Sequence, residues 1–144
     1  MSTENKYFPP NGLRVCIEKG DGVHLEGRFY SPLSEKVFSF CDFQELLLKA
    51  DSLFDQVGYP QSFQKKRSFQ QEDNKYPAYN AHPTIYRQAG EILKMEGGEA
   101  TFDILVVSRS KANWQGFVND KAGKRIGRFQ DVVQLINYLA AIYE

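Results

Sequence analysis

Two stretches of the chain share one pattern, and this repeat constrains the fold more than any other feature of the sequence. Residues 14–55 align with residues 103–144 at a constant offset of 89 positions and without a gap. Four of the 42 aligned positions are identical: Gly27/Gly116, Phe40/Phe129, Asp42/Asp131 and Leu46/Leu135. Because the apolar positions around them also agree, the sequence predicts one structural motif that is used twice.

Each repeat predicts three short strands followed by a helix. The predicted strands, in which apolar and polar residues alternate, cover residues 13–19, 24–31 and 36–40 in the first repeat and residues 102–108, 113–120 and 124–128 in the second. Turn-forming residues separate the strands, so we expect two hairpins in each repeat.

The helix starts carry a capping signal. Asp42 is followed three positions later by Glu45, and Asp131 is followed three positions later by Gln134. In such a capping box the Asp side chain accepts from a first-turn amide and the Glu or Gln side chain reaches back. Apolar residues then recur at helical spacing. We expect each helix to pack on the strands of its own repeat.

These elements predict an α+β fold with an internal duplication of a β-β-β-α unit. We expect an antiparallel sheet covered by two helices, with a pseudo-twofold axis relating the units. Residues 1–144 would form a single domain. Within it, residues 13–57 are the first repeat, residues 58–98 an aromatic-rich connector and residues 99–144 the second repeat. Since duplicated units often mimic a dimer, an ancestral homodimer is consistent with this plan.

The connector has no counterpart elsewhere in the chain, and it is too long to be a passive turn. A short helix over residues 85–95 is expected there, although Gly90 interrupts it. Because function often lies in such insertions, the connector supplies most of the candidate contacts to a ligand or partner. These candidates are Phe63, Lys65, Lys66, Arg67, Phe69, Tyr76, Tyr79, His82 and Tyr86, together with Trp114.

Trp114 is the single tryptophan, and two interpretations of it stay open. Its counterpart at the 89-residue offset is Leu25, which favours a large core or groove residue. The alternative is an exposed anchor for a partner, since Trp is enriched at interface hot spots. Gly27 and Gly116 stand inside strands, which indicates a bulge or a close approach of another group.

No residue pattern indicates catalysis, a cofactor or a metal. The two histidines, His24 and His82, and the two cysteines, Cys16 and Cys41, lack the spacing of a zinc site. Both cysteines are expected to be buried, reduced thiols. Asp42 and Asp131 are explained by capping, and no phosphate-binding glycine loop is present. An enzyme would need the connector to bring His82 beside an acid such as Asp73, so we predict a protein that is not an enzyme.

Charge and hydropathy narrow the classes of partner. The formal net charge is zero, which argues against binding nucleic acid or a membrane through bulk electrostatics and leaves self-association, including a homodimer, open. The first residues are polar, and no apolar run approaches the roughly 20 residues of a membrane span. Isolated cysteines and these features together predict a cytoplasmic location.

Two functions are consistent with this sequence. The first is a non-catalytic binding or regulatory module whose partner is a protein or a small molecule, held between the two units. The alternative is a nucleic-acid-binding protein, because basic residues interleaved with aromatics can hold a single strand. Its cationic residues would be Lys65, Lys66, Arg67, Arg125 and Arg128.

The C-terminal third carries a resemblance. A strand leads into Trp114-Gln115-Gly116, a hairpin follows, and Phe129 opens an amphipathic helix. This order resembles a type of small uncharacterised bacterial protein, mostly from Gram-positive organisms. The resemblance implies a bacterial domain of unknown function and carries over no active site. The strands followed by an Asp-capped helix are also similar in topology to antitoxins of the HicB kind, which would imply protein and nucleic-acid partners, although fold does not fix function.

Overall fold

The computed structural model describes residues 8–20, 25–58, 83–110 and 113–142. Six strands form one sheet in the order β3-β2-β1-β4-β5-β6, and every neighbouring pair is antiparallel. The strands are β1 (Gly12–Gly20), β2 (Leu25–Tyr30), β3 (Phe38–Phe40), β4 (Ala100–Ser110), β5 (Asn113–Asp120) and β6 (Arg125–Phe129). The helices are α1 (Phe43–Val57), α2 (Ala89–Leu93) and α3 (Val132–Ile142). The predicted α+β class with an antiparallel sheet is confirmed.

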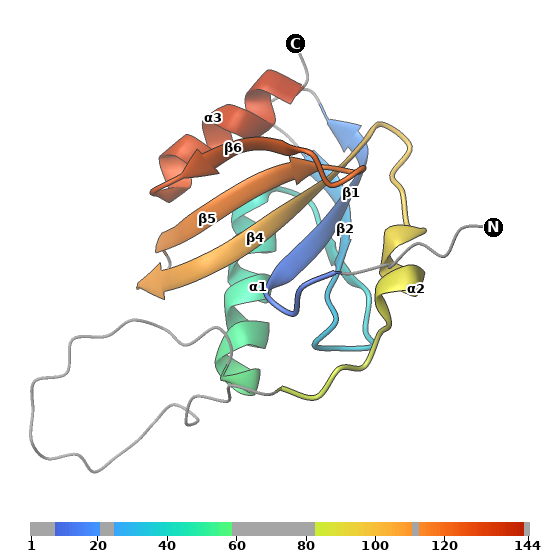
Figure 1. Cartoon of the computed structure of the whole chain (residues 1–144). Coiled ribbons are helices and arrows are strands. Elements are labelled where there is room, and N and C mark those ends of the chain that lie inside the picture. The colour runs from blue at the N-terminus through green and yellow to red at the C-terminus, as the bar shows by residue number, and fades with distance from the viewer. Residues whose placement is uncertain (1–7, 21–24, 59–82, 111–112, 143–144) are drawn as a thin grey trace, which may run out of the picture.

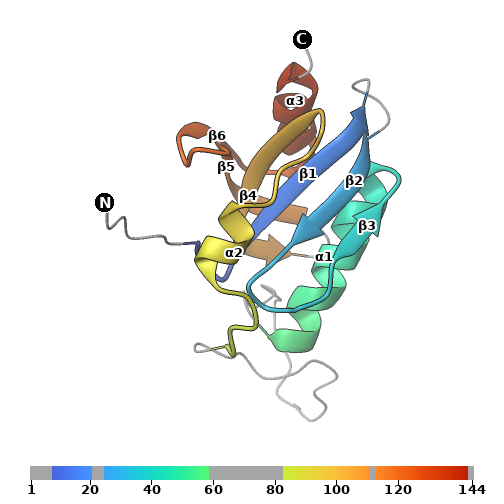
Figure 2. The same ribbon diagram turned by 90° about the vertical axis from the view of Figure 1, so that its right-hand side faces the viewer.

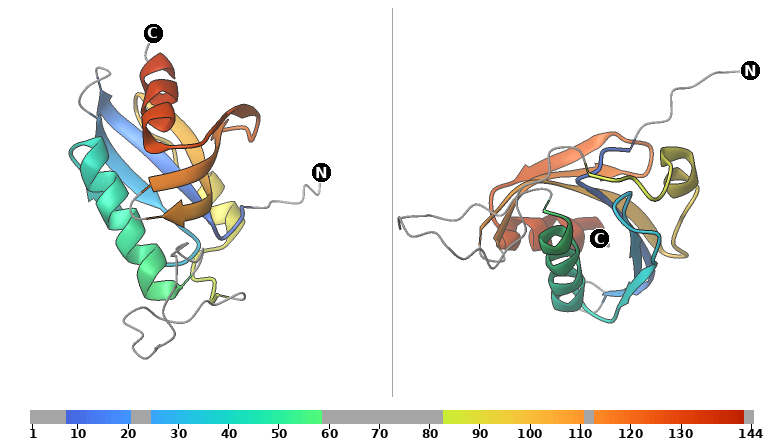
Figure 3. Two further views of the ribbon diagram at one scale, coloured as in Figure 1. Left: turned by 90° about the vertical axis from the view of Figure 1, so that its left-hand side faces the viewer. Right: turned by 90° about the horizontal axis from the view of Figure 1, so that it is seen from below.

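The two long helices lie on one face of the sheet and the short helix lies on the other (Figure 1). The sheet curves around α1 and α3, and α2 stands outside the curve (Figure 3). We call the face that carries α1 and α3 the inner face and the opposite one the outer face. The two long helices are the predicted ones, whereas the sequence analysis assigned no side of the sheet to α2.

Strand alternation separates a hydrophobic core from a polar face. In β1, Leu13, Val15 and Ile17 are fully buried in the core beneath the helices. The residues between them, Arg14 and Cys16, therefore point to the outer face. Each core side chain of this kind contributes roughly 1.5–3 kcal/mol through burial. The inner layer thus accounts for most of the hydrophobic stabilisation.

Both predicted capping boxes are present. The Asp42 carboxylate accepts from the amide of Glu45 at 2.8 Å, and the Asp131 carboxylate accepts from the amide of Gln134 at 2.9 Å. The Glu45 and Gln134 side chains each accept from the amide one residue before the cap, at 2.8 and 2.7 Å. These bonds satisfy amides that have no partner within the helix.

The centre of the sheet is the antiparallel pairing of β1 with β4. Arg14 faces Asp103 across this pair, and the register continues on both sides without a shift. The outer pairings are less regular. The register of β1 with β2 shifts between Ile17 and Lys19, and the register of β4 with β5 shifts between residues 106 and 108. Each half of the sheet therefore contains an irregularity close to where its hairpin begins, and such bulges increase local twist.

Two strand glycines lie against the backbone of the neighbouring strand. A Cβ on Gly27 would stand 2.0 Å from the Cys16 carbonyl oxygen, and a Cβ on Gly116 would stand 1.8 Å from the Leu105 carbonyl oxygen. Neither distance is compatible with a side chain. The close approach expected at both glycines is confirmed.

Three details differ from the sequence-based expectations. The helix expected over residues 85–95 is shorter, since α2 spans Ala89–Leu93. The strand expected over 36–40 is also shorter, because the Ser34 hydroxyl accepts from the Lys36 amide in a turn that delays β3. Cys41 is exposed and not buried, because it lies where the chain leaves the edge strand for the cap of α1. Cys16 is buried as predicted.

Among the described residues, no helix combines the length and the apolar character that a membrane crossing requires. The cytoplasmic location stays a prediction.

Replacing Gly116 with Ala is expected to destabilise the protein by about 3 kcal/mol, because the new methyl group must displace the backbone of β4. Gly98→Ala is the matched control. The Cβ there would meet only the end of the flexible Glu18 side chain, at 2.9 Å. Urea unfolding followed by circular dichroism measures both variants. Equal stability of the two variants would contradict the close approach at Gly116.

Candidate functional site

We call strands β1, β2 and β3 the first half of the sheet and strands β4, β5 and β6 the second half. The outer face of the first half is covered by another segment of the same chain. Residues 83–99, which we call the covering segment, run along this side of β1 and β2 (Figure 2). The Tyr86 amide donates to the Pro32 carbonyl at 2.7 Å, and the Glu99 amide donates to the Ile17 carbonyl at 2.8 Å. Ile92 of α2 is fully buried. The segment is therefore fastened at both ends and packed in the middle.

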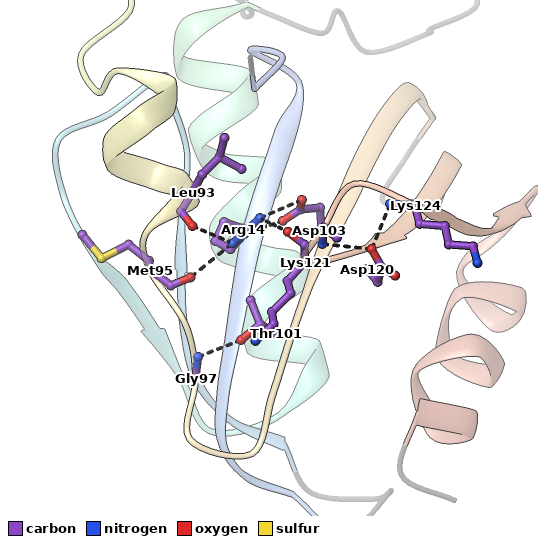
Figure 4. A network of polar contacts seen from close by, with 10 residues as sticks. Arg14, Leu93, Met95, Gly97, Thr101, Asp103, Asp120, Lys121 and Lys124 are labelled. Atoms are coloured by element: carbon purple, nitrogen blue, oxygen red, sulfur yellow. Dashed lines mark hydrogen bonds and ion pairs between the residues drawn. The ribbon is translucent and has the colours of Figure 1, made fainter. Parts of the chain in front are cut away.

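Arg14 holds the middle of the covering segment. Its guanidinium donates to the two carboxylate oxygens of Asp103 at 2.6 and 3.1 Å. It also donates to the carbonyl oxygens of Leu93, Met95 and Lys121, each at 3.3 Å (Figure 4). One buried cation thus connects β1, β4, the covering segment and the turn that follows β5.

The Arg14–Asp103 pair is almost fully shielded from water, with side-chain exposures of 1% and 6%. Burial raises the pKa of the Asp103 carboxyl above its usual range, and the Arg14 guanidinium opposes that rise. Removing two charges from water costs several kcal/mol per ion, and only additional hydrogen bonds make such a pair tolerable. The three carbonyl acceptors supply those bonds, so the covering segment belongs to the folded core of the network.

Two further arginines form hydrogen bonds between the covering segment and the rest of the first half. Arg28 of β2 donates to the carbonyl oxygen of Glu96 at 3.2 Å. Arg87 donates to the carbonyl oxygen of Glu35 at 2.6 Å, and its guanidinium lies 5.2 Å from the centre of the Tyr30 ring. Arginine donors therefore bind main-chain carbonyls across the whole outer face of the first half.

The outer face of the second half has a different character. Described side chains that point outward there include apolar, aromatic and cationic groups, and part of their surface is exposed. Val107 is 56% exposed, and it is the residue of β4 that is left unpaired at the register shift between residues 106 and 108. We call this set the open outer face; its members are Leu105, Val107, Gln115, Phe117, Arg125 and Arg128.

Phe117 and two arginines form the cationic end of the open outer face. The Arg125 guanidinium lies over the Phe117 ring, 3.8 Å from its centre, and its Nε donates to Asn119 at 2.9 Å. Arg128 is the cross-strand neighbour of Phe117. The nearby Asp120 carboxylate instead accepts from two amides of its own turn, at 2.9 and 2.8 Å. Phe117 therefore neighbours two arginines, Arg125 through stacking of the guanidinium and Arg128 through strand pairing.

On the inner face, Trp114 belongs to a polar cluster beneath α1. Its ring is fully buried, and its Nε1 donates to Asp51 at 2.9 Å. Arg109 donates to Asp51 at 3.0 Å and to Asp55 at 2.9 Å, and it lies over the Phe54 ring. Of the two interpretations of Trp114, the structure supports the core residue and not an exposed anchor. Helix α1 also reaches beyond its own half to contact β4 and β5.

The other predicted contact residues are placed as follows. Tyr86 lies in the covering segment and is 56% exposed, on the opposite side of the sheet from Trp114. The structure therefore does not bring these two residues together. The rest of the predicted set lies outside the described residues and stays a prediction: Phe63, Lys65, Lys66, Arg67, Phe69, Tyr76, Tyr79 and His82.

The sequence analysis missed the apolar part of the open outer face. One signal was available, because Ile104, Leu105, Val106 and Val107 form an apolar run without alternation. A strand with one solvated face normally alternates, so such a run indicates apolar groups on both faces. Arg125 and Arg128 were named as candidates for nucleic-acid contact, and the structure places both on this face.

Reactive groups are sparse in the described part of the chain. No three His, Cys, Asp or Glu side chains gather there in a way that could hold a metal ion. Both histidines lie outside the described residues. Burial raises the pKa of the Cys16 thiol to about 11, so near neutral pH this cysteine is a neutral, weakly nucleophilic group.

Compared with protein-family models, with curated proteins and with solved structures, the chain matches none of them significantly. A functional argument therefore depends on the geometry of the site.

Removing one partner of the central ion pair is expected to be costly. Asp103→Ala leaves the Arg14 cation buried without its counter-charge and should lower the unfolding free energy by about 3–5 kcal/mol. The double variant Arg14→Met with Asp103→Leu removes both charges and should recover much of that loss. It also removes the donor to three carbonyls, so hydrogen exchange should accelerate at residues 93–97. A double variant no more stable than Asp103→Ala would contradict this account.

The two cysteines should differ in reactivity. In the folded protein at neutral pH, a thiol-reactive disulfide reagent should label Cys41 and leave Cys16 unmodified, whereas both react in concentrated guanidinium chloride. Because the folded pKa of Cys16 is raised from 9.0 to about 11, its contribution to stability is full below pH 9.0 and falls as the pH rises toward 11. Mass spectrometry of the labelled protein shows which of the two cysteines has reacted. Rapid labelling of Cys16 in the folded protein would contradict its burial.

Proposed function

We propose that this protein is a non-catalytic binding module that holds a segment of another protein on the open outer face. The observation that carries this proposal is the difference between the two halves of the outer face. The first half is covered by the chain's own segment, which buries Ile92 fully. The second half leaves Val107 of β4 exposed beside Phe117 and Leu105.

Exposed apolar groups inside a strand support a partner. Single exposed apolar residues are common on protein surfaces, but here Val107 lies two residues from Leu105, which pairs with the aromatic Phe117. Interfaces are enriched in aromatic residues and arginine, both of which this face contains. No described element encloses it as a small-molecule site would be enclosed. A protein partner is therefore favoured over a small ligand.

We further propose that the two halves arose by internal duplication of a β-β-β-α unit and are related by a pseudo-twofold axis. Arg14 and Asp103 are separated by the repeat offset of 89 and face each other in the central strand pair. A twofold axis through this pair would exchange the two halves. Gly27 pairs with Phe40 in one half, and Gly116 pairs with Phe129 in the other.

Further correspondences support the duplication. The register shift after residue 17 corresponds to the shift after residue 106 at the same offset. The carbonyl that excludes a side chain at Gly27 belongs to Cys16, and the one at Gly116 belongs to Leu105, which is the matching position. Both helices begin with the same capping box. The duplication supports the binding proposal, because the covered half provides an example of a peptide segment lying on this type of surface.

Nucleic-acid binding is the second candidate, and the observation that favours it is the pair Arg125 and Arg128 beside an aromatic ring. Single-strand binding normally needs an accessible ring face for a base and a row of cations along the backbone. Here Arg125 already lies over Phe117. The zero net charge of the chain also gives little general attraction to phosphate. We therefore favour a protein partner.

Replacing Val107 with Glu should weaken binding of the natural partner by at least about tenfold, because a charge would be buried in the apolar contact. Tagged protein is used to capture partners from the native cell extract, and quantitative mass spectrometry compares the variants. The control is Leu48→Glu, a similar change at a side chain that is 59% exposed on α1. A protein captured equally by the wild type and both variants would show that partners bind elsewhere.

A separate titration tests the second candidate. Fluorescence anisotropy with labelled single-stranded oligonucleotides, at about 50 mM and at about 150 mM salt, should show no binding that weakens steeply with salt. Tight, strongly salt-dependent binding that is lost on Arg128→Gln would favour nucleic acid over a protein partner.

A further inference from the structure

The arginines of the open outer face lack the carboxylate partners that the other described arginines have. Arg14, Arg28, Arg87 and Arg109 each form an ion pair with at least one carboxylate. Within the described part of the chain, neither Arg125 nor Arg128 is paired with a carboxylate. The Arg125 Nε donates to the Asn119 side chain, and the Arg128 side chain forms no hydrogen bond with another described residue.

Their position makes this difference relevant to binding. Both side chains are exposed on β6, which is an edge strand of the sheet, and both lie next to the half-buried Phe117 of the neighbouring strand. The Arg125 guanidinium stacks on the Phe117 ring, with its central carbon 3.8 Å from the ring centre. An arginine held in this way loses less conformational entropy when it binds an acceptor, since its planar group is already oriented.

We propose that the open outer face recognises an acidic segment of a protein, with a carboxylate bound between Arg125 and Arg128 and an apolar side chain packed on Val107. This inference rests on the proposed binding function and specifies the chemistry of its partner. Guanidinium groups bind carboxylates through paired, charge-assisted hydrogen bonds. The apolar contact at Val107 supplies affinity, and the two cations select an anionic partner by charge complementarity.

A peptide carboxylate fits this face better than a nucleic-acid phosphate. The Phe117 ring is occupied by Arg125, so a base has no free aromatic surface there. Leu105 and the exposed Val107 offer contacts to an apolar side chain and none to a phosphate chain. The first half provides a precedent, since its arginines Arg14 and Arg28 bind carbonyl oxygens of a peptide segment.

The test measures anisotropy of a labelled short peptide that alternates Glu with Leu and Ser, and of the same peptide with Gln in place of Glu. At about 50 mM salt the Glu peptide should bind the wild type about tenfold more tightly than the Gln peptide does. The double variant Arg125→Gln with Arg128→Gln should lose that tenfold preference. The control variant, Lys36→Gln with Lys94→Gln, removes two other exposed cations and should keep it.

The outcomes separate this inference from the proposed function. Equal binding of the Glu and Gln peptides by the wild type, or equal losses in both double variants, would overturn the acidic-segment inference. A labelled oligonucleotide that binds more tightly than the Glu peptide, and depends on Arg125 and Arg128, would overturn it in favour of nucleic acid. If the natural partner is lost on Val107→Glu but retained by Arg125→Gln with Arg128→Gln, the binding function stands and the inference fails. If both variants retain the partner, the proposed function fails as well.

Discussion

The buried ion pair of Arg14 and Asp103 is the interaction on which the rest of the structure depends. It lies in the central strand pair of the sheet, and the same guanidinium binds carbonyls of the covering segment and of the turn after β5. Elements separated by about 80 to 107 residues in sequence therefore meet at one cation. Because loss of either partner would leave a buried charge uncompensated, the elements that meet at this cation must keep the arrangement that pairs the two charges.

The two faces of the sheet differ in how completely other parts of the chain cover them. The inner face is filled by α1 and α3, and α1 extends its contacts to Trp114 and Arg109 of the second half. Little of that layer is available to a partner. The outer face is covered in the first half only, and its second half leaves apolar and cationic groups accessible, Val107 and Arg128 among them. Binding is proposed there because this surface does not serve the core.

Much of the fold, and little of the candidate site, could be predicted from the sequence. Strand alternation and the Asp42 and Asp131 caps are local signals, and both helices begin where those signals occur. The exposure of Cys41 was missed because an apolar pattern around a residue does not reveal the turn of the chain at a strand end. The exposure of Val107 was missed because the apolar run around it does not show which half of the outer face is covered. Trp114 could be core or surface until its neighbours on α1 were known.

By itself, the sequence determined the number and type of the main elements and the helix starts, because these follow from periodicity and from capping residues close to each start. Only the tertiary structure decided that Arg14 meets Asp103, that residues 83–99 cover one half of the outer face and that Arg125 and Arg128 lie next to Phe117 on the other half. The physical reason is that partners in these contacts are selected by the pairing and curvature of the whole sheet. Such long-range pairing brings distant residues together through many weak contacts at once, and no single stretch of the chain encodes it.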